Sequence, residues 1–291
     1  MVTTSNLMNI KLCSPRSINE ALNFLSSPRH RPIAGGTDII PGIRSGRLSV
    51  DALVDISFLD ELRFIELFEN KIQIGANTTF TELIESDLLE KTCKIIIETA
   101  KNVGAEQTRN RGTIGGNLGN ASPAADLITT LLTLDANVVL ISLKGKRSLP
   151  LERFLLGPGK TGIEPGELIH HIYFDTLRDN SKAIYLKVGK RRGMACALAN
   201  LSLIISGNKE GYINKSYKVA IGAVAPTAIR CYKTEQILRT EASNEELINK
   251  SIKAICSECN PIDDIRATAN YRKYVVGKLL KHALEKLWSS N

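Results

Sequence analysis

The chain has 291 residues, of which 43% are apolar and 23% are charged, a composition typical of a globular protein long enough for two domains. No apolar run approaches the length of a membrane span. Lys and Arg exceed Asp and Glu by 38 − 30 = 8, but these charges are scattered and accompany no RNA-binding or zinc-finger signature, which argues against a nucleic-acid partner.

The first 55 residues predict a small α+β lobe. Ser17 and Glu20 have the spacing of a helix capping box, and apolar residues then recur at helical intervals, so a helix of about ten residues is expected after Ser17. Residues 31–40 follow with a short apolar strand, the pair Gly35 and Gly36, and two possible helix-cap residues. A buried strand is predicted at residues 52–56.

Residues 56–175 predict a second lobe. Residues 62–67 and 71–74 alternate like the two strands of a hairpin, and Thr79 and Glu82 repeat the capping-box spacing. Apolar residues then form one helical stripe through residues 88–103, which predicts a single helix. Further strands are predicted at residues 136–141 and 167–174.

The densest glycine segment of the chain lies between Arg109 and Asp126. It has four glycines within eight positions, and Ser122 and Pro123 then have the pattern of a helix N-cap and a first helical residue. A glycine turn with free N–H groups that leads into a helix N-terminus is suited to bind phosphate. The alternative is a tight turn that serves packing alone. The glycine pair at residues 35–36 favours the first interpretation, because two such turns could hold one diphosphate ester from two sides.

A charged turn at residues 175–182 places the boundary between a domain at 1–175, with lobes of about 1–55 and 56–175, and a domain at 176–291. Strand patterns at 183–188, 197–205 and 217–224 precede helical patterns at 234–238, 244–256 and 267–288, which predicts an α+β second domain. Residues 157–162 match G-x-G-x-x-G, but turn residues follow them, so a Rossmann dinucleotide turn is not expected.

The cysteines and the N-terminus argue against several other classes. Cys256 and Cys259 form a C-x-x-C pair, but no second pair or nearby His completes a metal or iron–sulfur site, and two thiols on a helix face are the simpler interpretation. No nucleophile-elbow or paired-histidine motif indicates a hydrolase. The first ten residues lack the basic and apolar regions of a signal peptide, which predicts a cytoplasmic protein.

Three segments resemble a known family. AGGTD at 34–38, RNRGTIGGN at 109–117 and SPAAD at 122–126 are similar to the FAD-pyrophosphate motifs of the flavoprotein subunit of molybdenum hydroxylases, and the resemblance extends over the whole chain. It implies an α+β fold, with a two-lobed FAD-binding domain of the vanillyl-alcohol-oxidase type followed by a smaller α+β C-terminal domain. It also implies that electrons pass from a molybdenum-cofactor subunit, through a [2Fe-2S] subunit, to this FAD and then to NAD or another acceptor.

By position, the resemblance assigns two groups of residues to FAD. The pyrophosphate would be held by Pro32, Ile33, Ala34, Gly35, Gly36, Thr37, Asp38 and Ile39 together with Thr113, Ile114, Gly115, Gly116 and Asn117. Val103 and Asp126 would lie beside the cofactor, Ile169 near its ring system and Lys187 near the flavin. The resemblance implies neither a catalytic residue nor a metal ligand in this chain.

Two questions stay open. GPGKT at 157–161 and APTAIRC at 225–231 resemble the xanthine dehydrogenase branch, which favours a purine such as xanthine over carbon monoxide, nicotinate or aldehyde substrates; a non-catalytic nucleotide-binding subunit is the other alternative. Four cations within residues 187–192 form either a solvated turn or a cationic edge beside the flavin. Such an edge would attract the phosphates of a nicotinamide dinucleotide.

Overall fold

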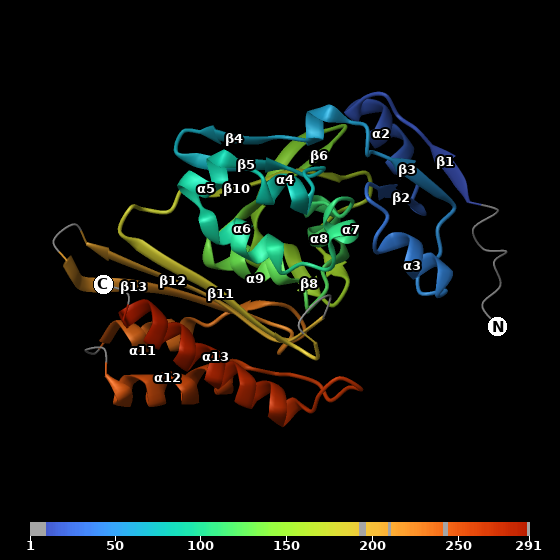
Figure 1. Ribbon diagram of the computed structural model, residues 1–291. Helices are drawn as coiled ribbons and strands as arrows, with labels where there is room; N and C mark the ends of the chain where they lie inside the picture. The colour runs from blue at the N-terminus through green and yellow to red at the C-terminus, as the bar shows by residue number, and fades with distance from the viewer. Residues whose placement is uncertain (1–9, 192–195, 209–210, 241–243, 290–291) are drawn as a thin grey trace.

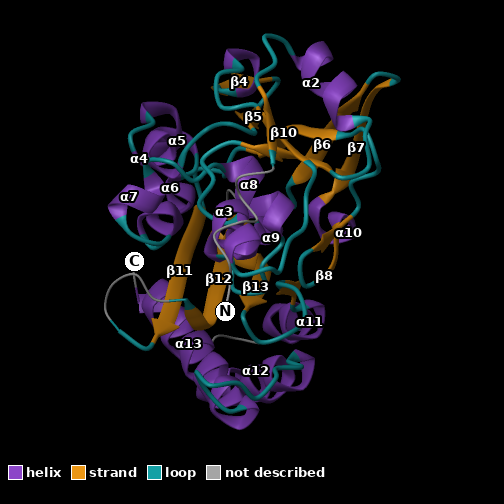
Figure 2. Cartoon of the chain, turned by 90° about the vertical axis from the view of Figure 1, so that its right-hand side faces the viewer, coloured by secondary structure: helices purple, strands orange, loops and turns teal. Residues whose placement is uncertain are grey.

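The computed structural model describes residues 10–191, 196–208, 211–240 and 244–289, which build three larger sheets of three, five and four strands. In Figure 1 the three-stranded sheet lies at one end of the molecule and the five-stranded sheet covers a central group of helices. The four-stranded sheet separates those helices from the C-terminal helices, as Figure 2 also shows. These layers confirm the α+β class.

The N-terminal lobe is a small parallel sheet with two helices. Its strands lie in the order β1 (Lys11–Cys13), β3 (Ala52–Asp55) and β2 (His30–Ile33), and its helices are α2 (Ile18–Leu25) and α3 (Ile39–Arg44). The Ser17 hydroxyl accepts a hydrogen bond from the Glu20 amide at 3.2 Å, so α2 begins where the capping pattern predicts. The turn after β2 carries the first glycine pair.

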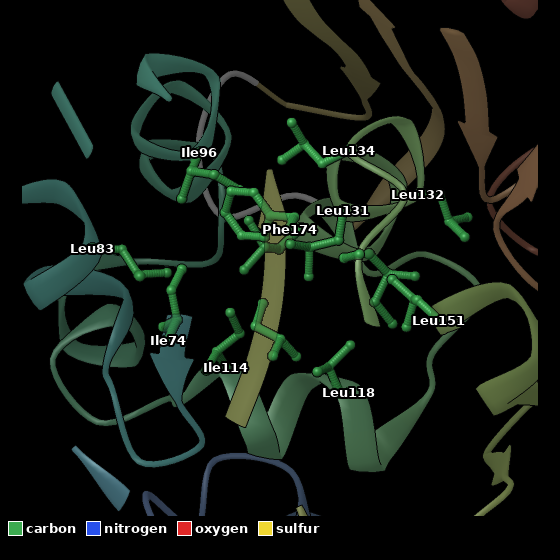
Figure 3. Packing of buried hydrophobic residues seen from close by; sticks show 14 of the residues in the cluster. Ile74, Leu83, Ile96, Ile114, Leu118, Leu131, Leu132, Leu134, Leu151 and Phe174 are labelled. Atoms are coloured by element: carbon green, nitrogen blue, oxygen red, sulfur yellow. The ribbon is translucent and has the colours of Figure 1, made fainter. Parts of the chain in front are cut away.

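The second lobe is a five-stranded antiparallel sheet with helices packed on one face. A short turn, η1 (Asp60–Leu62), leads into strands in the order β4 (Ile65–Phe68), β5 (Lys71–Gly75), β10 (Leu168–Asp175), β6 (Asn137–Ser142) and β7 (Gly145–Pro150). Its helices are α4 (Phe80–Ile84), α5 (Asp87–Thr92), α6 (Lys94–Lys101), α7 (Glu106–Arg109), α8 (Ile114–Asn120), α9 (Asp126–Thr133) and α10 (Leu151–Phe154). Figure 3 shows Phe174 of β10 in this core, with Ile96 of α6 and Leu131 of α9 beside it.

The single helix predicted at residues 88–103 is wrong, because the chain breaks into α5 and α6 at Cys93. Cys93 has φ −159° and ψ 58°, which lies outside the helical region, and it ends one helix and precedes the next. Its side chain is nevertheless 1% exposed, so the apolar stripe continues through the break. Periodicity alone therefore could not locate it.

The helix after the glycine segment also begins later than the sequence predicts. Ser122 is not its N-cap: the Ser122 hydroxyl accepts from the Ala124 amide at 3.3 Å and closes a local turn, and α9 begins at Asp126 after Ala125. Three of the four glycines lie in a separate short helix, α8, for which Thr113 is the N-cap. The chain then turns at Ala121, whose φ is +43°.

The C-terminal part has strands followed by helices, as predicted. The strands lie in the order β11 (Ser181–Gly189), β12 (Ala197–Asn208), β13 (Gly211–Gly222) and β14 (Ile229–Arg230), and the helices are α11 (Tyr232–Thr240), α12 (Glu245–Glu258) and α13 (Ala269–Ser289). Side chains alternate across this sheet: Ile204 and Ala220 belong to the core that contains α9, whereas Leu203 and Val219 belong to the core that contains α12 and α13. The sheet is thus shared by both cores.

The G-x-G-x-x-G segment and the C-x-x-C pair lie in different parts of the fold. The G-x-G-x-x-G segment forms a small hairpin, β8 (Leu155–Gly157) and β9 (Lys160–Thr161), without a helix after it. Cys256 lies on α12 and Cys259 at its C-cap, and no group of His, Cys, Asp or Glu among the described residues could hold a metal. Within the same residues, no helix is long and apolar enough to span a bilayer.

Candidate functional site

The main pocket of the N-terminal half opens beside the first glycine loop. It has a volume of about 620 Å³ and lies between the strand ends of the three-stranded sheet and Arg111, from the second glycine motif. Its wall combines apolar and polar side chains: Ile10, Leu12, Ile33, Ile40, Leu53 and Phe58 with Lys11, Asp55, Ser57 and Arg111. The two motifs are therefore brought together, although about 75 residues separate Gly36 from Arg111.

A second, smaller pocket of about 40 Å³ continues from the first. The two pockets share Ala34, Gly35, Ser57 and Arg111, and the smaller one reaches Thr113 at the start of α8. It is also lined by Asn77, whose side chain is fully buried. A groove therefore runs from the N-terminal lobe to the first turn of α8.

The first glycine loop supplies backbone donors to this groove. The amide N–H groups of residues 35–38 donate to no protein acceptor among the described residues. Gly36 has φ +73°, a conformation that favours glycine, and it turns the chain into α3. A series of free amides next to a helix start, in a pocket that Arg111 also lines, is suited to bind a diphosphate.

The second glycine motif contributes in a different way from the one predicted. Three amides of its first helical turn already have partners: Ile114 N donates to Thr78 O at 2.9 Å, Gly115 N to Ala76 O at 2.8 Å, and Gly116 N to the Thr113 hydroxyl at 3.1 Å. The expectation of a turn rich in free N–H groups is therefore wrong here. These bonds hold α8 in place, and Arg111 supplies the positive charge.

The glycines of α8 leave one helix face without side chains. Gly116 and Gly119 are exposed and three residues apart, so they lie on the same side of the helix. A Cβ at Gly116 would meet only the Thr113 hydroxyl, at 3.1 Å, and one at Gly119 only Ile169 Cδ1, at 3.8 Å. The protein's own packing does not require either glycine, so this face of α8 stays bare.

Two buried oxygens give an independent sign of a missing partner. Within the described residues, Oδ1 of Asn77 and Oδ1 of Asn117 are buried and accept no hydrogen bond. Asn77 lines the smaller pocket, and Asn117 follows Gly116 on α8. Buried polar atoms are normally satisfied, so each has a hydrogen-bonding position open to a bound group. The amides, the cation, the apolar wall and these acceptors fit a dinucleotide such as FAD.

The remaining predicted residues gather at the far end of α8. The Lys187 ammonium forms an ion pair with Asp126 at 2.6 Å and donates to the Asn102 carbonyl at 2.9 Å, next to half-buried Val103. Ile169 lies beneath Gly119. The structure thus brings Val103, Asp126 and Lys187 together and places Ile169 beside Gly119.

Lys187 is not part of a solvated turn, because its side chain is 11% exposed and ion-paired. Lys190 is exposed and donates to the Ile265 carbonyl at 2.8 Å, which leaves its charge at the surface. Arg192, the fourth cation of the predicted cluster, lies outside the described residues.

Several pocket residues escaped the sequence analysis. Arg111 stood inside the recognised motif, but its position did not distinguish its charge from that of Arg109, which instead donates to the Val103 carbonyl. Phe58, which is 82% exposed, and Asn77 belong to segments without any motif. The only available signal for Phe58 was its position directly after Ser57 and the strand predicted at residues 52–56, and nothing in the sequence indicated Asn77.

Comparisons with known proteins agree with this geometry. A sequence profile described as the FAD binding domain in molybdopterin dehydrogenase matches residues 8–174, and one described as the CO dehydrogenase flavoprotein C-terminal domain matches residues 184–287. The chain is 33% identical over 273 residues to the glyceraldehyde dehydrogenase medium chain of Sulfolobus acidocaldarius, covering 93% of this chain and 95% of that one.

Two further similarities bear on the branch of the family. A xanthine dehydrogenase FAD-binding subunit of Escherichia coli O157:H7 is 27% identical, with 92% of each chain covered. The fold matches a chain of carbon monoxide dehydrogenase from Hydrogenophaga pseudoflava with a TM-score of 0.92 and 28% identity, covering 97% of this chain and 98% of that one. Relatives with different substrates are therefore about equally similar.

Proposed function

This chain belongs to the FAD-binding medium subunits of the molybdopterin hydroxylase family, and on that premise we propose that it carries electrons from a [2Fe-2S] partner subunit to NAD or another acceptor. It is the FAD subunit of a molybdenum hydroxylase, an oxidoreductase. Bound FAD supplies a ring that accepts and releases electrons, which no protein side chain does as readily. The work of this chain is to bind, orient and shield that ring.

The observation that carries the proposal is the groove that joins both glycine motifs. We assign the diphosphate to the free amides of residues 35–38 and to the Arg111 guanidinium, and the adenosine half to the apolar wall formed by Ile33, Leu53 and Phe58. The bare face of Gly116 and Gly119 then leads toward Val103, Ile169 and Lys187. This order places the flavin half at the end of α8 where the ion pair of Lys187 and Asp126 lies.

The proposal divides the work between the two parts of the chain. Residues 1–175 bind FAD, and residues 176–291 close the site with the sheet that carries Lys187. The partners are a molybdenum-cofactor subunit and a [2Fe-2S] subunit, and neither nucleic acid nor a membrane is needed. A cytoplasmic location is part of the same proposal.

For the substrate of the complex we propose a purine such as xanthine, on the resemblance of residues 157–161 and 225–231 to that branch. The alternatives are an aldehyde, carbon monoxide or nicotinate, and the similarity to the glyceraldehyde dehydrogenase medium chain favours the aldehyde among them. The assembled complex should reduce its flavin with xanthine and not with glyceraldehyde; the reverse result would move the chain to the aldehyde branch.

The cofactor role is tested with the purified full chain. We expect one FAD per chain, with flavin absorption near about 450 nm, and slow reduction of a dye by NADH without any partner. Hydroxylation of xanthine by this chain alone, or a chain that takes up no FAD on reconstitution, would overturn the proposal. The latter result would favour a non-catalytic nucleotide-binding subunit.

A further inference from the structure

The Asp126 carboxylate is surrounded by donors from the four-stranded sheet. Oδ1 accepts from the Tyr185 hydroxyl at 2.6 Å and from the Asn200 amide nitrogen at 3.3 Å, and Oδ2 accepts from the Lys187 ammonium at 2.6 Å. Tyr185 and Lys187 lie on β11 and Asn200 on β12, whereas Asp126 is the first residue of α9. Asp126 is 7% exposed, so these bonds lie in a buried contact between the two halves of the chain.

The Asn200 amide is held in one orientation by a second contact. Its Oδ1 accepts from the Thr129 hydroxyl at 2.8 Å, which directs the amide nitrogen toward Asp126. Gly222 pairs with Asn200 across the sheet, and a Cβ there would overlap Asn200 Oδ1 and lie 2.5 Å from Thr129 Oγ1. The missing side chain of Gly222 is therefore what leaves room for this arrangement.

The Tyr185 hydroxyl is the donor in its hydrogen bond to Asp126. Burial, and then the charge of Asp126, raise the pKa of Tyr185 well above its usual range, so its hydroxyl is protonated at neutral pH. The ring of Tyr185 packs in the same core as Leu131 and Ile204. Its hydroxyl is therefore fixed by packing as well as by the hydrogen bond.

We propose that Tyr185, Asn200 and Gly222 are positioning residues that fix the Asp126 carboxylate and, through it, the Lys187 ammonium at the flavin end of the site. We call these five residues the Asp126 clamp. The inference rests on the proposed function, because it takes FAD to lie against Val103 and Lys187. It adds that the C-terminal sheet, through residues outside the recognised motifs, sets the electrostatics of the cofactor site.

The clamp gives Lys187 a different role from that of an isolated cation. Two of its three N–H donors are taken by Asp126 and the Asn102 carbonyl, which leaves one for a ligand. Its charge is compensated by the adjacent carboxylate, and that carboxylate is in turn compensated by Tyr185 and Asn200. Removal of a neutral donor should therefore make the site less positive toward the reduced flavin and shift the flavin equilibrium toward the oxidised form.

The first test is Tyr185→Phe in the FAD-loaded full chain. The redox equilibrium constant between the flavin and a reference dye should shift at least threefold toward oxidised flavin, and the dissociation constant for FAD should rise about threefold to tenfold. The matched control is Thr133→Val, which removes a buried hydrogen bond of 2.8 Å to Ser202 at the same interface, without contact to Asp126. The control should lose stability but leave both flavin constants unchanged.

The second test is Gly222→Ala, which acts on Asp126 only through Asn200. It should shift the flavin equilibrium in the same direction as Tyr185→Phe, although its Cβ lies on β13 and cannot touch Asp126 without displacing Asn200 and Thr129. The proposal would be overturned if Tyr185→Phe left the redox equilibrium constant and the FAD dissociation constant unchanged. It would also be overturned if Thr133→Val shifted both constants as much as Tyr185→Phe does. If Gly222→Ala does not fold, Asn200→Ala should give the same shift.

A readout without cofactor separates this inference from the proposed function. In the apo chain, a double-mutant cycle of Tyr185→Phe and Asp126→Asn should show a coupling of about tenfold or more in the unfolding equilibrium constant, as expected for a hydrogen bond to a charged group. If the cycle shows this coupling but the chain never binds FAD, the contact between Tyr185 and Asp126 is real but has no role at a flavin. Additive effects in a chain that does bind FAD would refute the clamp alone.

Discussion

The glycines of the two recognised motifs serve opposite purposes. A Cβ on Gly35 would overlap the backbone carbonyl oxygen of Arg111, and one on Gly115 would lie 2.7 Å from both Cβ and the carbonyl oxygen of Ala76. These two glycines let protein segments approach one another. Gly116 and Gly119 face open space apart from one contact each, so they keep a surface bare for a ligand. The same residue type in one motif thus supports the fold at one position and binding at the next.

Gly35→Ala should have the largest effect, and it should act on folding. The overlap involves backbone, which cannot turn away, so the loop and the Arg111 segment must separate; we expect a loss of about 3 kcal/mol or more in the free energy of unfolding. Urea denaturation of the apo chain measures it. Gly115→Ala should follow with a loss of about 1–3 kcal/mol, because the overlap with Ala76 is smaller. If the apo chain were as stable as the parent after either change, Gly35 and Gly115 would not be the glycines that let protein segments approach one another.

Gly116→Val should have the opposite signature. The apo chain should keep its circular dichroism spectrum and lose much less stability than Gly35→Ala, because the new Cβ meets only the Thr113 hydroxyl, which caps α8. The dissociation constant for FAD should rise about 100-fold, or about 2.7 kcal/mol. Fluorescence titration of the apo chain with FAD gives the constant. Tight FAD binding in this variant would remove the bare helix face from the site.

Arg111→Met should weaken FAD binding about tenfold while leaving the fold intact. Arg111 lines both pockets and has no ion pair within the described residues, so its charge is available to the diphosphate. The dependence of FAD binding on salt concentration should also be weaker in Arg111→Met. Arg31→Met is the control, because Arg31 is exposed on β2 and bonds only neighbouring carbonyls. Equal losses in both variants would indicate a general effect of charge.

The sequence was sufficient for the motifs and for many of the elements, since both depend on local patterns, but it missed the break at Cys93. The capping boxes located α2 and α4, and the two glycine segments do meet in one groove. It failed where tertiary contacts decide: the amides of α8 are taken by Ala76 and Thr78, far away in the chain, and Ser122 closes a turn before α9. The partners of Asp126, on β11 and β12, lie 59 or more residues away, beyond any local pattern.

Gly119→Ala should have the smallest effect and gives the sharpest comparison, because stability and binding should change in opposite directions. Gly119 lies inside α8, where alanine is preferred over glycine by about 0.5–1 kcal/mol, and the new Cβ would only touch Ile169 at 3.8 Å. The apo chain should therefore unfold at a higher urea concentration.

The same methyl group would occupy part of the bare face, so the dissociation constant for FAD should rise a few-fold, mainly through faster release. Addition of FAD should then stabilise Gly119→Ala less than it stabilises the parent, since stabilisation by a ligand grows with the ratio of its concentration to the dissociation constant. Thermal unfolding of both chains, with and without FAD, measures the two effects together. If the variant gains stability and binds FAD as tightly as the parent, the ligand does not lie along α8 at this turn, and the path from the pocket to Lys187 must pass elsewhere.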